Sequence, residues 1–109
     1  MTPAEVKRMI DAVGIPAAYH QFAENTGQQP PFICFFYGPS SDLAADNTNY
    51  VRIEQLIIEL YTDTKDFDLE SRLESVLNQN EYVFAKSETF LDGEHMHETI
   101  YTTNVYLEV

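Results

Sequence analysis

The stretch RIEQLIIELYT, residues 52–62, has the alternating pattern of a β-strand with two different faces. Successive side chains of a strand point to opposite faces of the sheet. Leu56, Ile58 and Leu60 share one face, which is apolar and therefore predicted to face the core. The opposite face is mixed and carries Ile53, Gln55, Ile57, Glu59 and Tyr61. This second face is too apolar for a plain solvent surface and too polar for a second core, so we expect something to cover it.

An amphipathic helix is predicted at residues 3–13. Thr2 and Glu5 have the spacing of a capping box, and Pro3 suits the first helical position. Gly14 is expected at C′, because positive φ costs little at a residue that lacks a Cβ atom. The apolar residues of this helix recur at helical spacing and form one stripe that needs a surface to cover it.

A second helix is predicted at residues 67–79, with Asp66 as its N-cap. Its apolar stripe again follows the helical period and consists of Leu69, Leu73, Val76 and Leu77. The residues between the first helix and residue 30 give no clear period. Pro16 blocks a simple continuation of the helix, so Ala17–Tyr19 are expected in an added helical turn or an ordered loop.

Four strands are predicted, at residues 32–37, 50–62, 82–91 and 95–109. Asp92-Gly93 predicts a two-residue type I′ turn between the last two strands, because this turn needs positive φ at both positions. Residues 40–49 are expected to form a long loop. The chain is thus predicted to be a single α+β domain over residues 1–109, with element order α–β–β–α–β–β: a mainly antiparallel four-stranded sheet with both helices on one face.

The composition is strongly acidic. The chain of 109 residues has 18 Asp and Glu against 6 Lys and Arg, a formal net charge of −12. Phosphate binding needs clustered cations, so this balance argues against nucleic acid as a direct partner. The single cysteine, Cys34, fits a reducing compartment and is expected to be buried. No signal peptide or membrane-spanning run is recognisable, so we expect a soluble protein that is intracellular when made.

No residue pattern predicts catalysis or a cofactor. His95 and His97 are two residues apart, a spacing that places both side chains on the same side of a strand. Zinc normally takes three or four protein ligands, however, and the possible third histidine, His20, is distant in the sequence. Ser40, Ser41 and Asp42 lack a companion histidine, and no phosphate-binding glycine motif is present. We therefore expect neither an enzyme nor a metal protein, although a small enzyme or metal protein using His95 and His97 remains an alternative.

The aromatic residues are the best candidates for a contact surface, because tyrosine combines a large area with a polar tip. Core packing is the alternative for each of them. Together with the mixed strand face, they give the candidate subunit interface Ile53, Gln55, Ile57, Glu59, Tyr61, Tyr101 and Tyr106. The polar loop gives a candidate partner contact formed by Asp42, Asp46, Asn47 and Asn49.

The chain resembles the tail terminator or tail-completion proteins of long-tailed bacteriophages and prophages. The resemblance lies in the element order, and in the stretches IPAAYHQFAENTGQQPPFICFFYG and NYVRIEQLIIELYTDTKDFDLESRLESVL. It implies a virion protein, made in the host cytoplasm, that forms a ring of typically six subunits at the head-proximal end of the tail. Its implied partners are the tail-tube protein and the head connector or a head-completion protein. No motif of this family carries catalysis.

Two further functions stay open at this level. The chain resembles neighbouring head-completion or minor capsid proteins in the same respects. An acidic protein of this size can also act as an inhibitor that mimics DNA and occupies a nucleic-acid enzyme. Such mimicry needs carboxylates spaced like phosphates on one face, whereas the acidic residues here are spread along the chain.

Overall fold

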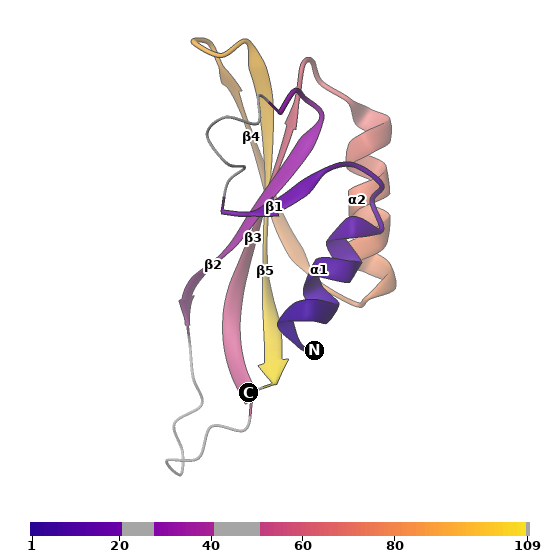
Figure 1. Ribbon diagram of the computed structural model, residues 1–109, viewed down its shortest axis with the longest axis vertical. Helices are drawn as coiled ribbons and strands as arrows, with labels where there is room; N and C mark the ends of the chain where they lie inside the picture. The colour runs from indigo at the N-terminus through magenta and orange to yellow at the C-terminus, as the bar shows by residue number, and fades with distance from the viewer. Residues whose placement is uncertain (21–27, 41–50, 109) are drawn as a thin grey trace.

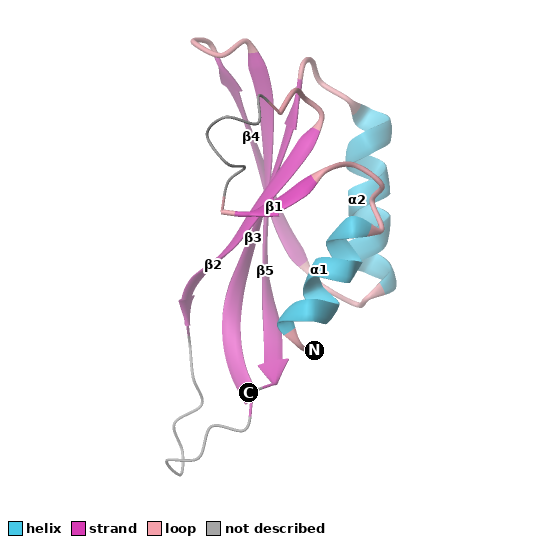
Figure 2. Ribbon diagram, in the orientation of Figure 1, coloured by secondary structure: helices cyan, strands magenta, loops and turns pink. Residues whose placement is uncertain are grey.

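The computed structural model describes residues 1–20, 28–40 and 51–108, with only the backbone described at residues 39, 40, 51, 52 and 108. Figures 1 and 2 show a twisted sheet with two helices against one face. The elements are α1 (Pro3–Asp11), β1 (Ala17–Tyr19), β2 (Phe32–Ser40), β3 (Val51–Thr62), α2 (Phe67–Gln79), β4 (Phe84–Leu91) and β5 (Met96–Glu108). The α+β class and the placement of both helices on one face are therefore confirmed.

The sheet has five strands in the order β1-β2-β3-β5-β4, so the prediction of four strands was wrong. The added strand β1 pairs in parallel with β2, while the other three pairings are antiparallel. Backbone hydrogen bonds extend this pairing on both sides, from Ile33 N to Pro16 O at 2.9 Å and from His20 N to Phe35 O at 2.8 Å. The order is thus α–β–β–β–α–β–β, and the sheet is mixed.

The capping box of α1 is confirmed. Glu5 N donates to Thr2 Oγ1 at 3.2 Å, and Thr2 N donates to Glu5 Oε1 at 3.0 Å. The helix ends at Asp11 rather than at residue 13, with Ala12 as its C-cap. Gly14 has the expected positive φ, +93°, but lies two residues beyond this cap instead of at C′. A Cβ atom at Gly14 would lie 2.9 Å from Arg72 Nη2, so glycine is favoured there by close approach as well.

Helix α2 has the predicted bounds and the predicted cap. The side chain of Asp66 accepts a hydrogen bond from Leu69 N at 3.0 Å. This bond satisfies one of the amides that a helix leaves unpaired at its start, and the carboxylate lies at the positive end of the helix dipole.

We expect Asp66→Ala to lower the free energy of unfolding by about 1 kcal/mol, the usual effect of removing an N-cap. Urea denaturation followed by circular dichroism measures this change. Asp63→Ala is the matched control, because it removes the same charge from an exposed residue outside the helix. Equal destabilisation by the two variants would contradict a capping role for Asp66.

The β4–β5 hairpin differs from the predicted two-residue turn. Leu91 pairs with Met96, so four residues form the connection. Glu94 N donates to Leu91 O at 3.1 Å, and the residue with positive φ is His95, at +52°. Longer hairpin loops are usually built around a type I turn, which needs no positive φ at its central residues. The Asp-Gly pair marked the turn correctly but not its type.

The core lies between the helices and the sheet face that they cover. Leu56, Ile58 and Leu60 of β3 are each 0% exposed, as the alternation of this strand predicted. The helices contribute their apolar stripes to the same core, with Val6, Ile10, Leu73 and Leu77 also fully buried. Neither helix of the described residues is long and apolar enough to cross a membrane.

Candidate subunit interface

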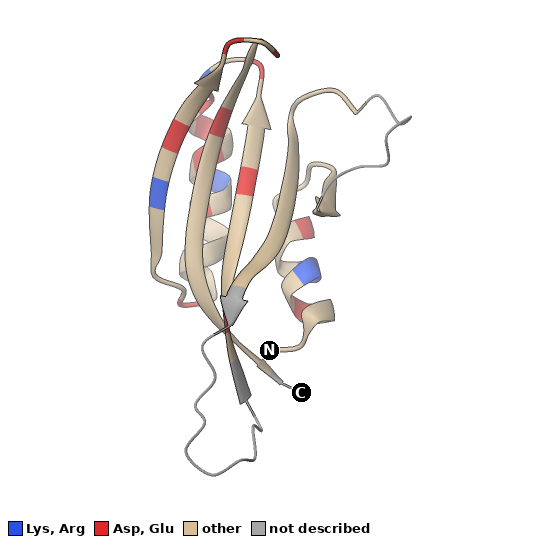
Figure 3. Ribbon diagram, turned by 90° about the vertical axis from the view of Figure 1, so that its left-hand side faces the viewer, with Lys and Arg blue, Asp and Glu red and all other residues tan. Residues whose placement is uncertain are grey.

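The second face of β3 lies on the side of the sheet away from the helices. Figure 3 looks onto this side, and both helices lie behind the strands. The predicted residues Ile53, Gln55, Ile57, Glu59 and Tyr61 are all partly exposed there. Strand register places further side chains beside them. We call the whole surface the open sheet face: Phe32, Cys34 and Phe36 of β2; Ile53, Gln55, Ile57, Glu59 and Tyr61 of β3; Ala85, Ser87 and Thr89 of β4; Glu98, Ile100, Thr102, Asn104 and Tyr106 of β5.

Aromatic rings pack on the β2 side of the open sheet face. Phe32 lies opposite Tyr61, and the two rings stack with centroids 4.9 Å apart. Phe36 lies opposite Ile57, and the ring of His20 stacks on it with centroids 5.7 Å apart. These contacts hold a band of apolar area beside Ile57 in place. Such preformed, half-apolar surface is typical of protein contacts.

The carboxyl groups of Glu59 and Glu98 are neighbours on this partly apolar surface. Glu98 is opposite Tyr61 in the register of β3 and β5, which makes it a diagonal neighbour of Glu59. Tyr61 Oη donates to Glu59 Oε1 at 3.3 Å. Burial, followed by the charge of Glu98 and a hydrogen bond with it, raises the pKa of Glu59. Burial and a hydrogen bond with Glu98 likewise raise the pKa of Tyr61.

The predicted interface residues Tyr106 and Tyr101 lie on opposite faces of the sheet. Tyr106 is 57% exposed and lies on the open sheet face opposite Ile53. Tyr101 is 0% exposed and lies on the helix side, so its assignment to the interface was wrong. Its hydroxyl donates to Glu74 Oε2 of α2 at 2.7 Å. The alternation of β5 already separates the two residues, because odd-numbered and even-numbered positions point to opposite faces.

Other predicted positions do not join the open sheet face. The loop candidates Asp42, Asp46, Asn47 and Asn49 lie outside the described residues, as do most positions of the expected loop. His95 lies in the turn rather than in the strand, and His97 Nε2 lies 3.4 Å from Glu88 Oε2. The described part of the chain brings no three potential metal ligands together. Cys34 is buried as expected.

An ion cluster on the helix side was not anticipated from the sequence. Glu70 of α2 is 2% exposed, and its Oε1 accepts from Lys65 Nζ and Lys86 Nζ, each at 2.8 Å. Lys86 also contacts Glu74 at 2.8 Å. Burial acts to raise the pKa of Glu70, but the hydrogen bonds and charges of the two lysines outweigh it and hold that pKa below its ordinary value. The cluster connects α2 to β4. The feature of the sequence that could have indicated it is the i, i+4 spacing of Glu70 and Glu74 on α2.

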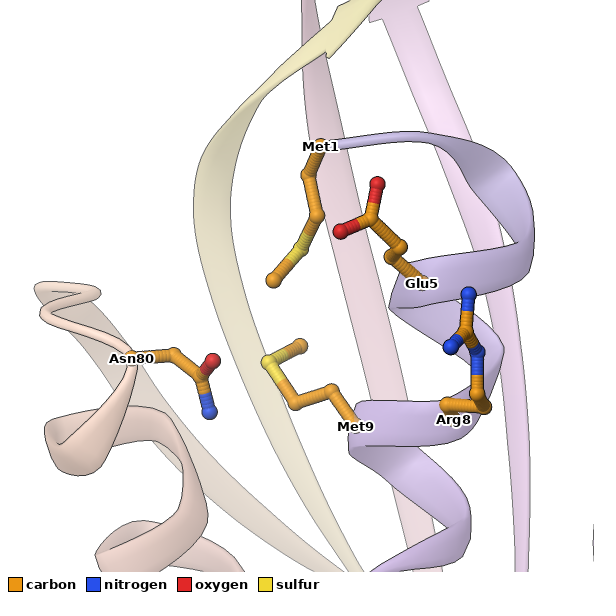
Figure 4. A pocket seen from close by; sticks show the side chains of 5 residues that line it. All are labelled: Met1, Glu5, Arg8, Met9 and Asn80. Carbon is orange, nitrogen blue, oxygen red and sulfur yellow. The ribbon is translucent and has the colours of Figure 1, made fainter.

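Two cavities lie beside α1. Figure 4 shows one of about 290 Å³ between α1 and the end of α2, lined by Met1, Glu5, Arg8, Met9 and Asn80. Glu5 is engaged in the capping box, so its carboxylate already has a structural role. A more apolar groove of about 460 Å³ is lined by Pro3, Ala4, Lys7, Tyr19, Phe35 and Tyr37. Neither cavity brings together the acid, base and nucleophile that catalysis requires.

Comparison with known proteins adds information on the fold. No protein-family model matches the sequence, and no curated protein matches it either. Among solved structures, the chain is similar to one described as "Virion of native gene transfer agent (GTA) particle", with a TM-score of 0.57 and 14% sequence identity. The match covers 93% of this chain and 84% of that chain. The protein therefore shares its fold, over nearly its whole length, with a component of a virion particle.

Proposed function

We propose that this protein is a structural subunit of a phage-type virion that forms a ring, of six copies in the family it resembles, at the head-proximal end of the tail tube. The observation that carries the proposal is the open sheet face. One side of the sheet is covered by α1 and α2, whereas the other keeps a half-apolar surface formed from β2, β3 and β5. The fold shared with a component of a gene transfer agent virion supports the same role.

Ring formation follows from the type of contact that this surface favours. An isologous contact would place the carboxyl pairs of two copies in one interface, where their charges repel. A heterologous contact places the open sheet face of one copy against a different surface of the next, and such contacts form a ring when the rotation between copies closes. The ring would terminate the tail and join it to the head connector or a head-completion protein. This role needs no catalytic step, cofactor, membrane or sequence-specific nucleic-acid contact.

The acidic balance also suits a ring around a DNA channel. Each copy carries a formal net charge of −12. Repeated around a channel, this charge would repel the phosphate backbone and keep DNA from adhering during passage. The proposed role therefore gives the acidity a use that does not require mimicry of DNA.

Ile57→Asp tests the proposal. Purified protein is examined for rings by light scattering and electron microscopy, alone and with a tail-tube protein, the partner that the proposal names. Burying an unpaired carboxylate in the contact should weaken it by about 3 kcal/mol or more, which is at least a hundredfold in affinity. Ser71→Asp, which adds the same charge at an exposed position of α2, should assemble like the wild type.

Two outcomes would contradict the proposed role. One is that the wild-type protein stays monomeric and does not bind tail tubes. The other is that Ile57→Asp forms the same assemblies as Ser71→Asp, which would show that the open sheet face is not the contact.

A further inference from the structure

The open sheet face carries Glu59 and Glu98 as its only charged side chains, within the part of the chain that the structure describes. They belong to adjacent strands and are diagonal neighbours in the register of β3 and β5, and burial and the charge of Glu98 raise the pKa of Glu59. Tyr61 adds its hydroxyl to Glu59 at 3.3 Å. The pair therefore lies within the surface that the proposed ring contact would cover, toward the Tyr61 end of β3.

Among the described residues packed around the pair, none carries a positively charged side chain. β2 contributes Cys34 opposite Glu59, β3 contributes Tyr61, and β4 contributes the neutral Thr89 opposite Glu98. His20, stacked on Phe36, and Tyr106, opposite Ile53, are further titratable groups that the structure describes on or beside this surface. The nearest lysines of the sheet and its connections, Lys65 and Lys86, are bound to Glu70 on the helix side.

We propose that contact between copies through the open sheet face is linked to proton uptake by the Glu59–Glu98 pair, so that acid pH favours assembly and ionisation of the pair opposes it. This inference rests on the proposed function and adds the regulation of its contact. A neighbouring subunit would remove the water that still reaches both carboxyl groups. Two ionised carboxylates in contact would then repel each other with little screening, whereas a pair that shares one proton carries one charge fewer.

The direction of the pH effect follows from linkage. The pKa of Glu59 is already raised in the single chain by burial and by Glu98, and further burial in a contact raises it more. A group whose pKa is higher in the assembled state favours that state at low pH, and the advantage is lost as pH rises through the raised pKa. A partner that inserted a lysine or arginine between the carboxylates would give the opposite sign, because ionised carboxylates would then be favoured.

Sedimentation velocity at constant ionic strength, between about pH 5 and pH 8, tests the inference on the full chain. We expect the wild-type dissociation constant to rise at least tenfold over this range. In E59Q/E98Q, neutral amides replace the pair, so association should stay strong and its pH dependence should be largely lost. D92N/E94Q is the matched control: it removes the same two formal charges from the exposed hairpin turn and should keep the wild-type slope.

Each contrary result has a distinct meaning. A wild-type slope retained in E59Q/E98Q would overturn the inference and assign the effect to other groups such as His20. Association that strengthens with rising pH would also overturn it and would indicate a cation from the neighbour. A chain that never associates would refute the proposed function instead. In that case an NMR titration that follows the carboxyl carbons of the single chain tests the inference independently of assembly. The inference is contradicted if neither carboxyl group of the pair has a raised pKa.

Discussion

Replacing Ile58 by alanine is expected to lower the free energy of unfolding by about 2–5 kcal/mol, the range found for large-to-small changes in a packed core. Ile58 is 0% exposed and lies between Phe35 of β2 and Tyr101 of β5. The change leaves a cavity that the surrounding side chains cannot fully close. Ile57 offers a matched control in the next position, because it has the same side chain on the opposite, partly exposed face.

For Ile57→Ala, at a partly exposed position, we expect a smaller loss of about 1 kcal/mol, the centre of the range found for single substitutions. Thermal and urea denaturation under monomeric conditions measure both variants, and Ile58→Ala should melt roughly 10 °C or more below the wild type. In the assembly experiment we expect the opposite ranking of the two variants. Ile57→Ala should weaken ring formation, whereas the folded fraction of Ile58→Ala should still form rings. Equal effects of the two variants in either measurement would contradict the two-faced description of β3.

The elements that the sequence predicted well are those whose signals are local. The long alternation of β3 fixes which side chains face the core, and α2 combines a side-chain cap at Asp66 with a stripe of helical period. β1 could not be found in this way, because Ala17–Tyr19 spans only three residues and shows no usable period. Its place depends on parallel pairing with β2, which is distant in sequence and leaves no local trace.

The candidate interface was predictable in part for the same reason. Ile53, Ile57 and Tyr61 follow from the alternation of one strand, whereas Tyr101 was assigned by residue type against the alternation of its own strand. The neighbour relation of Glu59 and Glu98 required the register of β3 against β5. α2 and β4 lie between these strands in the chain, so no turn sets that register, and sequence patterns cannot supply it.

The ion cluster beneath α2 gives the second large effect. Changing both Lys65 and Lys86 to methionine should lower the free energy of unfolding by about 3–5 kcal/mol, because it leaves the carboxylate of Glu70 buried without a counter-charge. Lys7→Met/Arg8→Met is the matched control. It removes the same charge from α1, where Lys7 is 42% exposed and pairs with Asp11 at i, i+4 spacing, an arrangement worth about 0.5 kcal/mol or less.

The pH dependence of stability separates this cluster from the pair on the open sheet face. Burial acts to raise the pKa values of Glu70 and Glu74, but the hydrogen bonds from their partners lower both below the ordinary value. Their contribution is therefore present above the ordinary glutamate pKa of about 4.3 and is lost as pH falls through the lowered values. In the double methionine variant this acid-induced loss should largely disappear, because Glu70 no longer has partners to lose.

A third variant shows whether an unpaired charge, rather than lost lysine packing, causes the destabilisation. Adding Glu70→Leu to Lys65→Met/Lys86→Met removes the buried carboxylate, so most of the lost stability should return. Urea denaturation of all three proteins at neutral pH gives the comparison. If the triple variant stays as unstable as the double variant, the lysine stems contribute by packing against α2 and β4, and the charges of the cluster do not hold the helix to the sheet.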